Sequence, residues 1–264
     1  MNIILRELKA HRRSLIGWSV GMFFLILVGM VKYQGFASSG QSANDLFKGL
    51  PTLAALFGVQ SVDISTAIGF YSVLFLYILV MVSIHASLLG ADIISKEEQD
   101  KTAEFLFAKP VTRRQAITSK LQAALINVVI LNLVTLVSSV VIVGAYNKGA
   151  SVTGDILLMM VGMFFIQLIF LSIGTAAAAL SKIPKLAAPV ATSIMLITFF
   201  LSLWLDITKK YSGLKYLTPF KYFEAKTIIN NGSYDPVFYA LSLGIIVVML
   251  IATYRFYSVR DLSV

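Results

Sequence analysis

The chain has no cysteine among its 264 residues and little charge, because Asp, Glu, Lys and Arg together make up only 13%. The absence of cysteine excludes disulfide bonds and thiolate metal sites. The shortage of charge excludes an ordinary soluble domain, in which about 25% of residues are charged. Apolar residues make up 58% of the chain. This composition indicates an integral membrane protein.

The apolar residues come in unbroken blocks and lack the alternating pattern of membrane β-barrel strands. A block of about 20 apolar residues is long enough to cross the hydrocarbon core as a helix. The blocks predict an all-α, polytopic fold with a single transmembrane domain over residues 1–264. Its six predicted spans are residues 14–31, 68–91, 122–145, 156–180, 186–205 and 237–254.

Lysine and arginine are distributed unevenly between the two sets of loops. With the N-terminus inside, the inner segments hold 14 of the 22 basic residues, including all seven arginines. Cytoplasmic loops carry such an excess, so the pattern predicts a plasma-membrane protein with both termini in the cytoplasm. The net charge of +9 therefore needs no nucleic-acid partner. The inner segments are 1–13, 92–121, 181–185 and 255–264.

Three segments predict shorter helices at the membrane surfaces. Residues 1–13 are basic with an apolar face, which favours an interfacial helix against lipid headgroups; a solvated basic tail is the alternative. We expect the first span to be retained as an anchor and not cleaved as a signal peptide. On the outer side, residues 46–59 predict a short surface helix. Residues 218–231 predict another, half-dipped into the outer leaflet, with Phe220, Phe223 and Ile228 on its apolar face.

The loop between the second and third spans is unusually charged, with nine charges in residues 97–121. Ser95 to Glu98 reads S-x-x-E and predicts a helix that opens near residue 96, while Thr112 to Gln115 reads T-x-x-Q and predicts a second one. Pro110 separates them. A charged helix with an apolar tip suits insertion into a cleft on another protein. A solvated connector is the alternative.

This loop resembles the inner-loop motif of the type-2 family of ABC transporter permeases. The resemblance extends to the segments LRELKAHRRSLIGWSVG, LTPFKYFEAKTII and FYSVRDLSV, and so covers most of the chain. One departure is Lys101, where many members have glycine, and this departure predicts a more helical turn. The matching loop residues are Glu98, Thr102, Glu104, Phe105, Leu106, Pro110, Arg113 and Lys120.

The resemblance implies a permease subunit that exports a substrate, driven by a separate ATPase subunit docked on this loop. Two permease subunits, identical or sister chains, would sit over two ATPase copies, and the ATPases would bind ATP and Mg²⁺. The chain itself has no G-x-x-x-x-G-K-[ST] motif for cradling phosphates. The ATPase-coupling residues implied are Glu97, Glu98, Thr102, Glu104, Phe105, Leu106, Pro110 and Arg113.

The spans contain little other chemistry. His85 is the ionisable residue within them. We expect a structural role for it, in a helix–helix hydrogen bond, and a functional role is the alternative. Gly17 and Gly21 form a G-x-x-x-G pattern that marks either a dimer contact or close packing within the chain. No metal, cofactor or catalytic motif is visible, so we expect no enzyme. A secondary carrier and a non-transporting scaffold or immunity protein are the alternatives, and the missing membrane carboxylates weaken the carrier.

Overall fold

The computed structural model describes residues 3–38, 54, 62–102, 111–147, 149, 151–208 and 211–259. Within these ranges six helices are long and apolar enough to cross a membrane, which confirms the all-α fold with six spans. Most helices extend beyond their predicted spans, α1 by 11 residues at its start, because hydropathy marks only the part in hydrocarbon. The six are α1 (Ile3–Ser38), α4 (Ala67–Gln99), α6 (Arg113–Tyr146), α7 (Thr153–Leu180), α8 (Ala187–Thr208) and α10 (Pro236–Val259).

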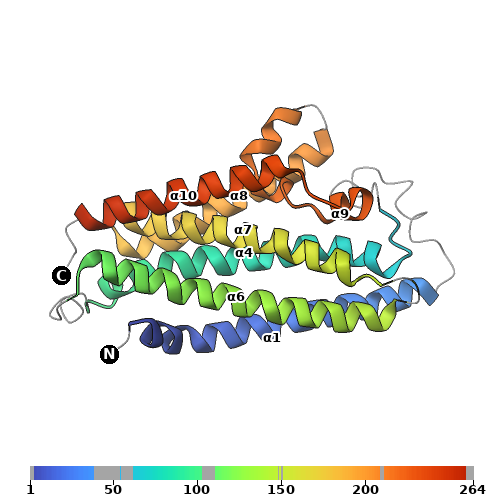
Figure 1. The fold of residues 1–264 in the computed structure, drawn as a ribbon, viewed down its shortest axis with the longest axis horizontal. Helices are drawn as coiled ribbons and strands as arrows, with labels where there is room; N and C mark the ends of the chain where they lie inside the picture. The colour runs from blue at the N-terminus through green and yellow to red at the C-terminus, as the bar shows by residue number, and fades with distance from the viewer. Residues whose placement is uncertain are drawn as a thin grey trace.

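The long helices run beside one another along the length of the molecule (Figure 1). Helix α1 begins and α10 ends at the same end of the bundle at which α4 ends and α6 begins. We call this the loop end and the opposite one the far end. An even number of spans requires both chain ends on one side, and the arrangement agrees.

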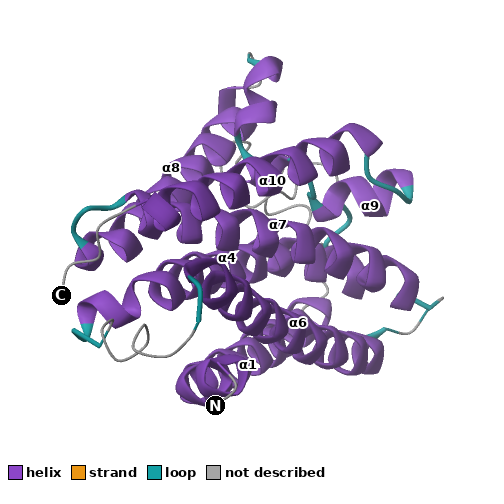
Figure 2. Ribbon diagram, turned by 60° about the vertical axis from the view of Figure 1, so that its left-hand side comes forward, coloured by secondary structure: helices purple, strands orange, loops and turns teal. Residues whose placement is uncertain are grey.

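Helices α4 and α7 form the centre of the bundle. Within the most apolar stretch of each helix, the buried share is 56% in α4 and 61% in α7, compared with 11% in α10. Helix α4 touches α1, α6, α7 and α8, and in Figure 2 it lies between α1 and α7. The outer helices expose large apolar side chains, as lipid-facing helices do. A movement of α4 therefore reaches most of the protein.

Two glycines bring α4 and α7 into backbone contact. A Cβ atom on Gly90 would lie 2.3 Å from the carbonyl oxygen of Leu171, and one on Gly174 would lie 2.5 Å from that of Ser87. Small residues allow such close approach between membrane helices, where dispersion contacts replace the hydrophobic effect as the driving force. The predicted glycine pair behaves differently, since a Cβ on Gly17 or Gly21 would meet nothing within 4 Å. No part of the chain that the structure describes therefore packs closely against that pair.

Buried polar side chains link the helices inside the bundle. The hydroxyl of Tyr71 on α4 donates to Ser139 on α6 at 2.7 Å, and the amide of Asn132 donates to Gln167 on α7 at 3.2 Å. The hydroxyls of Thr175 and Thr253 meet at 3.1 Å. These polar side chains bond to one another inside the protein because the hydrocarbon core of the membrane offers them no hydrogen-bond partner.

The N-terminal segment is the first part of α1 and not a separate helix, since α1 is unbroken from Ile3 to Ser38. Ile4, Leu8 and Leu15 pack against the buried core, in agreement with the apolar face that the sequence predicts. The apolar face of the segment thus packs against the rest of the bundle.

At the far end of the bundle, the predicted helix over 218–231 is broken into two pieces. A 3-10 turn, η4 (Pro219–Lys221), is followed by α9 (Ala225–Asn231), which ends at Gly232 with a left-handed φ of 71°. Thr218 does not cap the turn, because its hydroxyl donates to the carbonyl of Thr198 on α8. The remaining short elements are η2 (Pro184–Leu186) and η3 (Ser212–Leu217). Of the predicted helix over 46–59, only residue 54 is described.

The apolar side chains of this segment pack against protein, whereas the sequence predicts that they dip into the outer leaflet. Phe220, Phe223 and Ile228 are buried in the core, where Phe223 stacks on Phe165 of α7.

The contact at Gly90 gives a direct test of the α4–α7 packing. Gly90→Ala should lower the stability of the folded chain by about 1–3 kcal/mol, because the added methyl forces two backbones apart. Gly244→Ala is the matched control, since the space beside Gly244 on α10 is open; it should be neutral or stabilise by about 0.5–1 kcal/mol. Thermal unfolding in detergent measures both. Equal melting of the two variants would contradict this packing.

Candidate functional site

The end of α4 differs from the helix start that the sequence predicts near residue 96. Ser95 lies inside α4, 1% exposed, and its hydroxyl donates to the carbonyl of Ala91 at 2.7 Å. It therefore does not act as an N-cap, and the S-x-x-E interpretation is wrong. The local pattern fails because Ile93 and Ile94 are fully buried and keep the helix going.

Helix α4 ends in a Schellman motif at the start of the loop. The N–H of Thr102 donates to the carbonyl of Glu97 at 2.8 Å, and that of Lys101 donates to the carbonyl of Glu98. Lys101 takes the left-handed conformation with a φ of 56°, the position in this motif that usually holds glycine. The expected helical turn at Lys101 is thus wrong, because lysine adopts here the backbone that a glycine would.

Glu97 forms the centre of a buried ion cluster just before this turn. Its carboxylate accepts a bond of 2.6 Å from Arg6 on α1 and a second from Lys120 on α6. Lys120 is 1% exposed and also donates to the carbonyl of Ile93 on α4. Three helices that are distant in sequence therefore meet on one carboxylate.

A second carboxylate, Glu7, completes the cluster. It is fully buried and pairs with the neighbouring Arg6 at 2.7 Å. The ammonium of Lys96 on α4 lies 3.7 Å from the other oxygen of Glu7. We call Arg6, Glu7, Lys96, Glu97 and Lys120 the loop-end cluster.

The energetics of the loop-end cluster favour rigidity over raw stability. Taking charges out of water costs several kcal/mol per ion, which the mutual attraction roughly offsets. Removing one partner, however, leaves an uncompensated buried charge and costs about 3–5 kcal/mol. The cluster therefore holds α1, α4 and α6 in one arrangement.

The other end of the loop is anchored on a different helix. The predicted capping box at Thr112 is confirmed, with Thr112 and Gln115 bonding reciprocally at the start of α6. The guanidinium of Arg113 donates to the carbonyls of Tyr257 and Ser258 at the C-terminal end of α10. Cations are favoured there because the last carbonyls of a helix lack intrahelical partners.

The remaining predicted site residues are placed as follows. Glu98 is buried, 6% exposed, and Thr102 is exposed at the end of the turn. Glu104, Phe105, Leu106 and Pro110 lie outside the described residues. Sequence reasoning missed Glu7 and gave Lys120 no role. The signals for them were weak: a lone acid in a basic segment, and a lysine at the edge of an apolar block.

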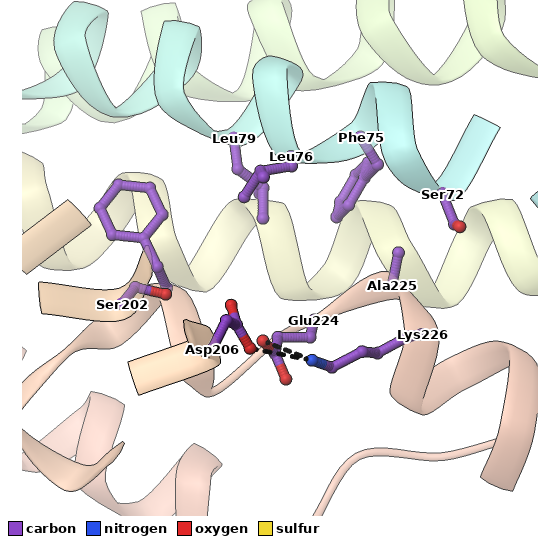
Figure 3. Close-up of a pocket in the computed structure, with 10 residues that line it drawn as sticks. Ser72, Phe75, Leu76, Leu79, Ser202, Asp206, Glu224, Ala225 and Lys226 are labelled. Atoms are coloured by element: carbon purple, nitrogen blue, oxygen red, sulfur yellow. Dashed lines mark hydrogen bonds and ion pairs between the residues drawn. The ribbon is translucent and has the colours of Figure 1, made fainter. Parts of the chain in front are cut away.

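A second charge cluster lies at the far end of the bundle. Lys221 bridges the carboxylates of Asp206 on α8 and Glu224, and Lys226 pairs with the same two groups at 3.4 and 3.2 Å. Figure 3 shows Asp206, Glu224 and Lys226 beside a small pocket that Phe75 and Leu79 of α4 also line. Burial by itself lowers the pKa of Lys226, but the two carboxylates outweigh it and raise the pKa above its usual value. The two lysines balance the two carboxylates, and this far-end cluster connects η4 and α9 to α8.

His85 behaves differently from the expected helix–helix hydrogen bond. Its ring is buried, and its Nδ1 has no hydrogen-bond partner among the described residues. The ring packs edge-on against Trp18 of α1 at 5.4 Å.

These features are those of a membrane-spanning subunit whose loop is anchored from both ends. Residues 1–262 match the profile of the ABC-2 family transporter proteins, and the chain belongs to this family. It is thus a multi-pass membrane permease of an ABC transporter, a component that has no ATPase domain of its own and works with an ATPase subunit. A search of curated proteins gave no match.

The loop-end cluster can be tested with a double-mutant cycle on Glu97 and Lys120. Glu97→Gln and Lys120→Met should each destabilise the chain, by up to about 3–5 kcal/mol, because each leaves a buried charge unpaired. The double variant should be more stable than the sum of the two losses, by about 1–3 kcal/mol. Chemical or thermal unfolding in detergent measures the cycle.

The matched control pairs Lys120→Met with Asp155→Asn, which removes a carboxylate in the first turn of α7. Their effects should add. Additive effects in the Glu97 cycle itself would show that the two side chains are not coupled.

Proposed function

We propose that this permease exports a substrate across the plasma membrane, with both chain ends in the cytoplasm and the loop end facing an ATPase subunit. Residues 96–113 are the docking segment. Two permease chains, identical or sister, sit over two ATPase copies, which bind ATP and Mg²⁺. Six of the seven arginines lie at the loop end, on the start of α1, the start of α6 and the end of α10, which supports placing this end on the cytoplasmic side.

The anchoring of both loop ends supports this proposal most directly. The loop leaves α4 beside Glu97, which is bonded to Arg6 of α1 and Lys120 of α6. It enters α6 beside Arg113, which is bonded to the end of α10. A push on the loop is therefore delivered to four helices at once. A flexible connector would absorb the same push.

Buried and exposed residues have different roles within the docking segment. Glu97 faces its own chain, so its part in coupling is to pass movement of the loop to α1 and α6. The charged side chains that reach solvent at the turn are Asp100 and Lys101, and Thr102 is exposed beside them. Contact with the ATPase then falls to residues 100–112, with Phe105 and Leu106 as the apolar anchor, since aromatic anchors dominate interface energies.

The open space beside Gly17 and Gly21 supports a contact with a second permease chain. Neither glycine is packed closely against the described residues of the chain, and small residues permit close helix–helix approach in lipid. Two-fold pairing is the commonest form of assembly. The pair of glycines on α1 thus offers a face that a second subunit can cover.

Docking is tested by Phe105→Ala together with Leu106→Ala. The double variant should lower co-purification of the ATPase and abolish stimulation of its turnover by the permease, while the six helices still insert. Lys182→Ala, at an exposed position between α7 and α8, is the control and should leave both readouts unchanged. Full complex formation and full export by the double variant would contradict the docking assignment.

A further inference from the structure

A pocket of about 240 Å³ lies between α1, α4, α6 and the start of α8, close to the loop-end cluster. Since a water molecule takes up about 30 Å³, the pocket has room for the polar head and first carbons of a larger molecule. Its lining includes polar groups that neither packing nor the proposed ATPase docking explains. The pocket therefore needs an account of its own.

Two imidazoles that line this pocket each have one ring nitrogen without a hydrogen-bond partner. His85 Nδ1 and His11 Nε2 are buried, and neither is bonded within the described part of the chain. The nearest carboxylate oxygen to His11 Nε2, that of Glu7, is 3.8 Å away, beyond hydrogen-bonding distance. Both atoms are closed off from the pocket, so a ligand there does not reach them. The nitrogen of His11 that lies beside Asp92 is Nδ1.

Asp92 gives the pocket its charge. It is the one lining residue with a full charge at neutral pH, and its carboxylate lies 3.9 Å from His11 Nδ1. The neighbouring lysines are directed elsewhere, because Lys96 approaches Glu7 and Lys120 is bonded to Glu97. A carboxylate beside neutral imidazole nitrogens accepts hydrogen bonds from an ammonium group and repels an anion.

The walls of the pocket are apolar and aromatic. Trp18 lies against His85, and an indole face attracts cations more strongly than other aromatic rings do. Leu88 lines the pocket and is 36% exposed on the lipid side of the bundle. His85 and Asp92 are seven residues apart on α4, about 10 Å along the axis. An occupant thus has a polar head near Asp92 and an apolar body that enters from lipid.

We propose that this pocket binds the ammonium head of an amphiphilic primary amine. The ammonium donates to the carboxylate of Asp92 and to Nδ1 of His11, and the alkyl chain runs along Leu88 and the Trp18 ring toward lipid. This site belongs to the permease chain alone. Its test therefore needs no ATPase, and its outcome is independent of the docking proposal.

Trp18 serves as the reporter for the test. The chain has two tryptophans, so Trp204→Phe leaves Trp18 as the sole one. The purified chain in neutral detergent is titrated at neutral pH with dodecylamine, dodecanol and dodecyl phosphate. Dodecylamine should change the Trp18 emission saturably, whereas dodecanol and dodecyl phosphate should give no saturable change.

Asp92→Asn in the same background should weaken the apparent affinity for dodecylamine about tenfold, because a charge-assisted hydrogen bond is replaced by a neutral one. The substitution is isosteric at a half-exposed position, and an unchanged melting temperature confirms that the fold is kept. Asp155→Asn is the matched control and should bind as the parent does.

Three results would overturn the proposal. Dodecanol that binds as well as the amine would show an apolar groove only. Dodecyl phosphate that binds in its place would show an anion site. Unchanged dodecylamine affinity in Asp92→Asn would show that the carboxylate does not recognise the head group.

Discussion

The buried carboxylate of Glu97 is the constraint on which the loop end of this permease depends. It accepts from Arg6 on α1 and Lys120 on α6, and its backbone carbonyl also accepts the bond that closes the Schellman turn. One residue therefore fixes where α4 stops, how the loop leaves it and which helices meet there. Since Glu97 is only 3% exposed, each partner is required to offset the cost of burying the others.

The rest of the bundle carries this constraint away from the loop. Helix α4 packs on α7 through the backbone contacts at Gly90 and Gly174, so the two central helices have little freedom to slide. Farther along, α4 borders the far-end cluster around Asp206 and Lys226. A displacement of the loop thus meets a rigid central pair that connects both ends of the molecule. Rigid packed elements of this kind transmit force better than loops do.

The sequence was sufficient for features that depend on local pattern. The six spans follow from the length of each apolar block, and the capping box at Thr112 follows from its own four residues. Features set by partners distant in sequence were not predictable in this way. Ser95 reads as a cap but is buried within α4, and the partners of Glu97 lie 91 and 23 residues away. Only the folded arrangement brings Arg6, Glu97 and Lys120 together.

Hydrogen exchange over residues 3–11 tests most directly whether the loop-end cluster joins α1 to α4. In the native chain the amides of this segment should exchange slowly, and Glu97→Gln should speed their exchange about tenfold or more while residues 22–30 of α1 keep their protection, because the first turns are released from α4. Asp155→Asn should leave both segments unchanged. Equal protection of residues 3–11 in the native and Glu97→Gln chains would contradict the account.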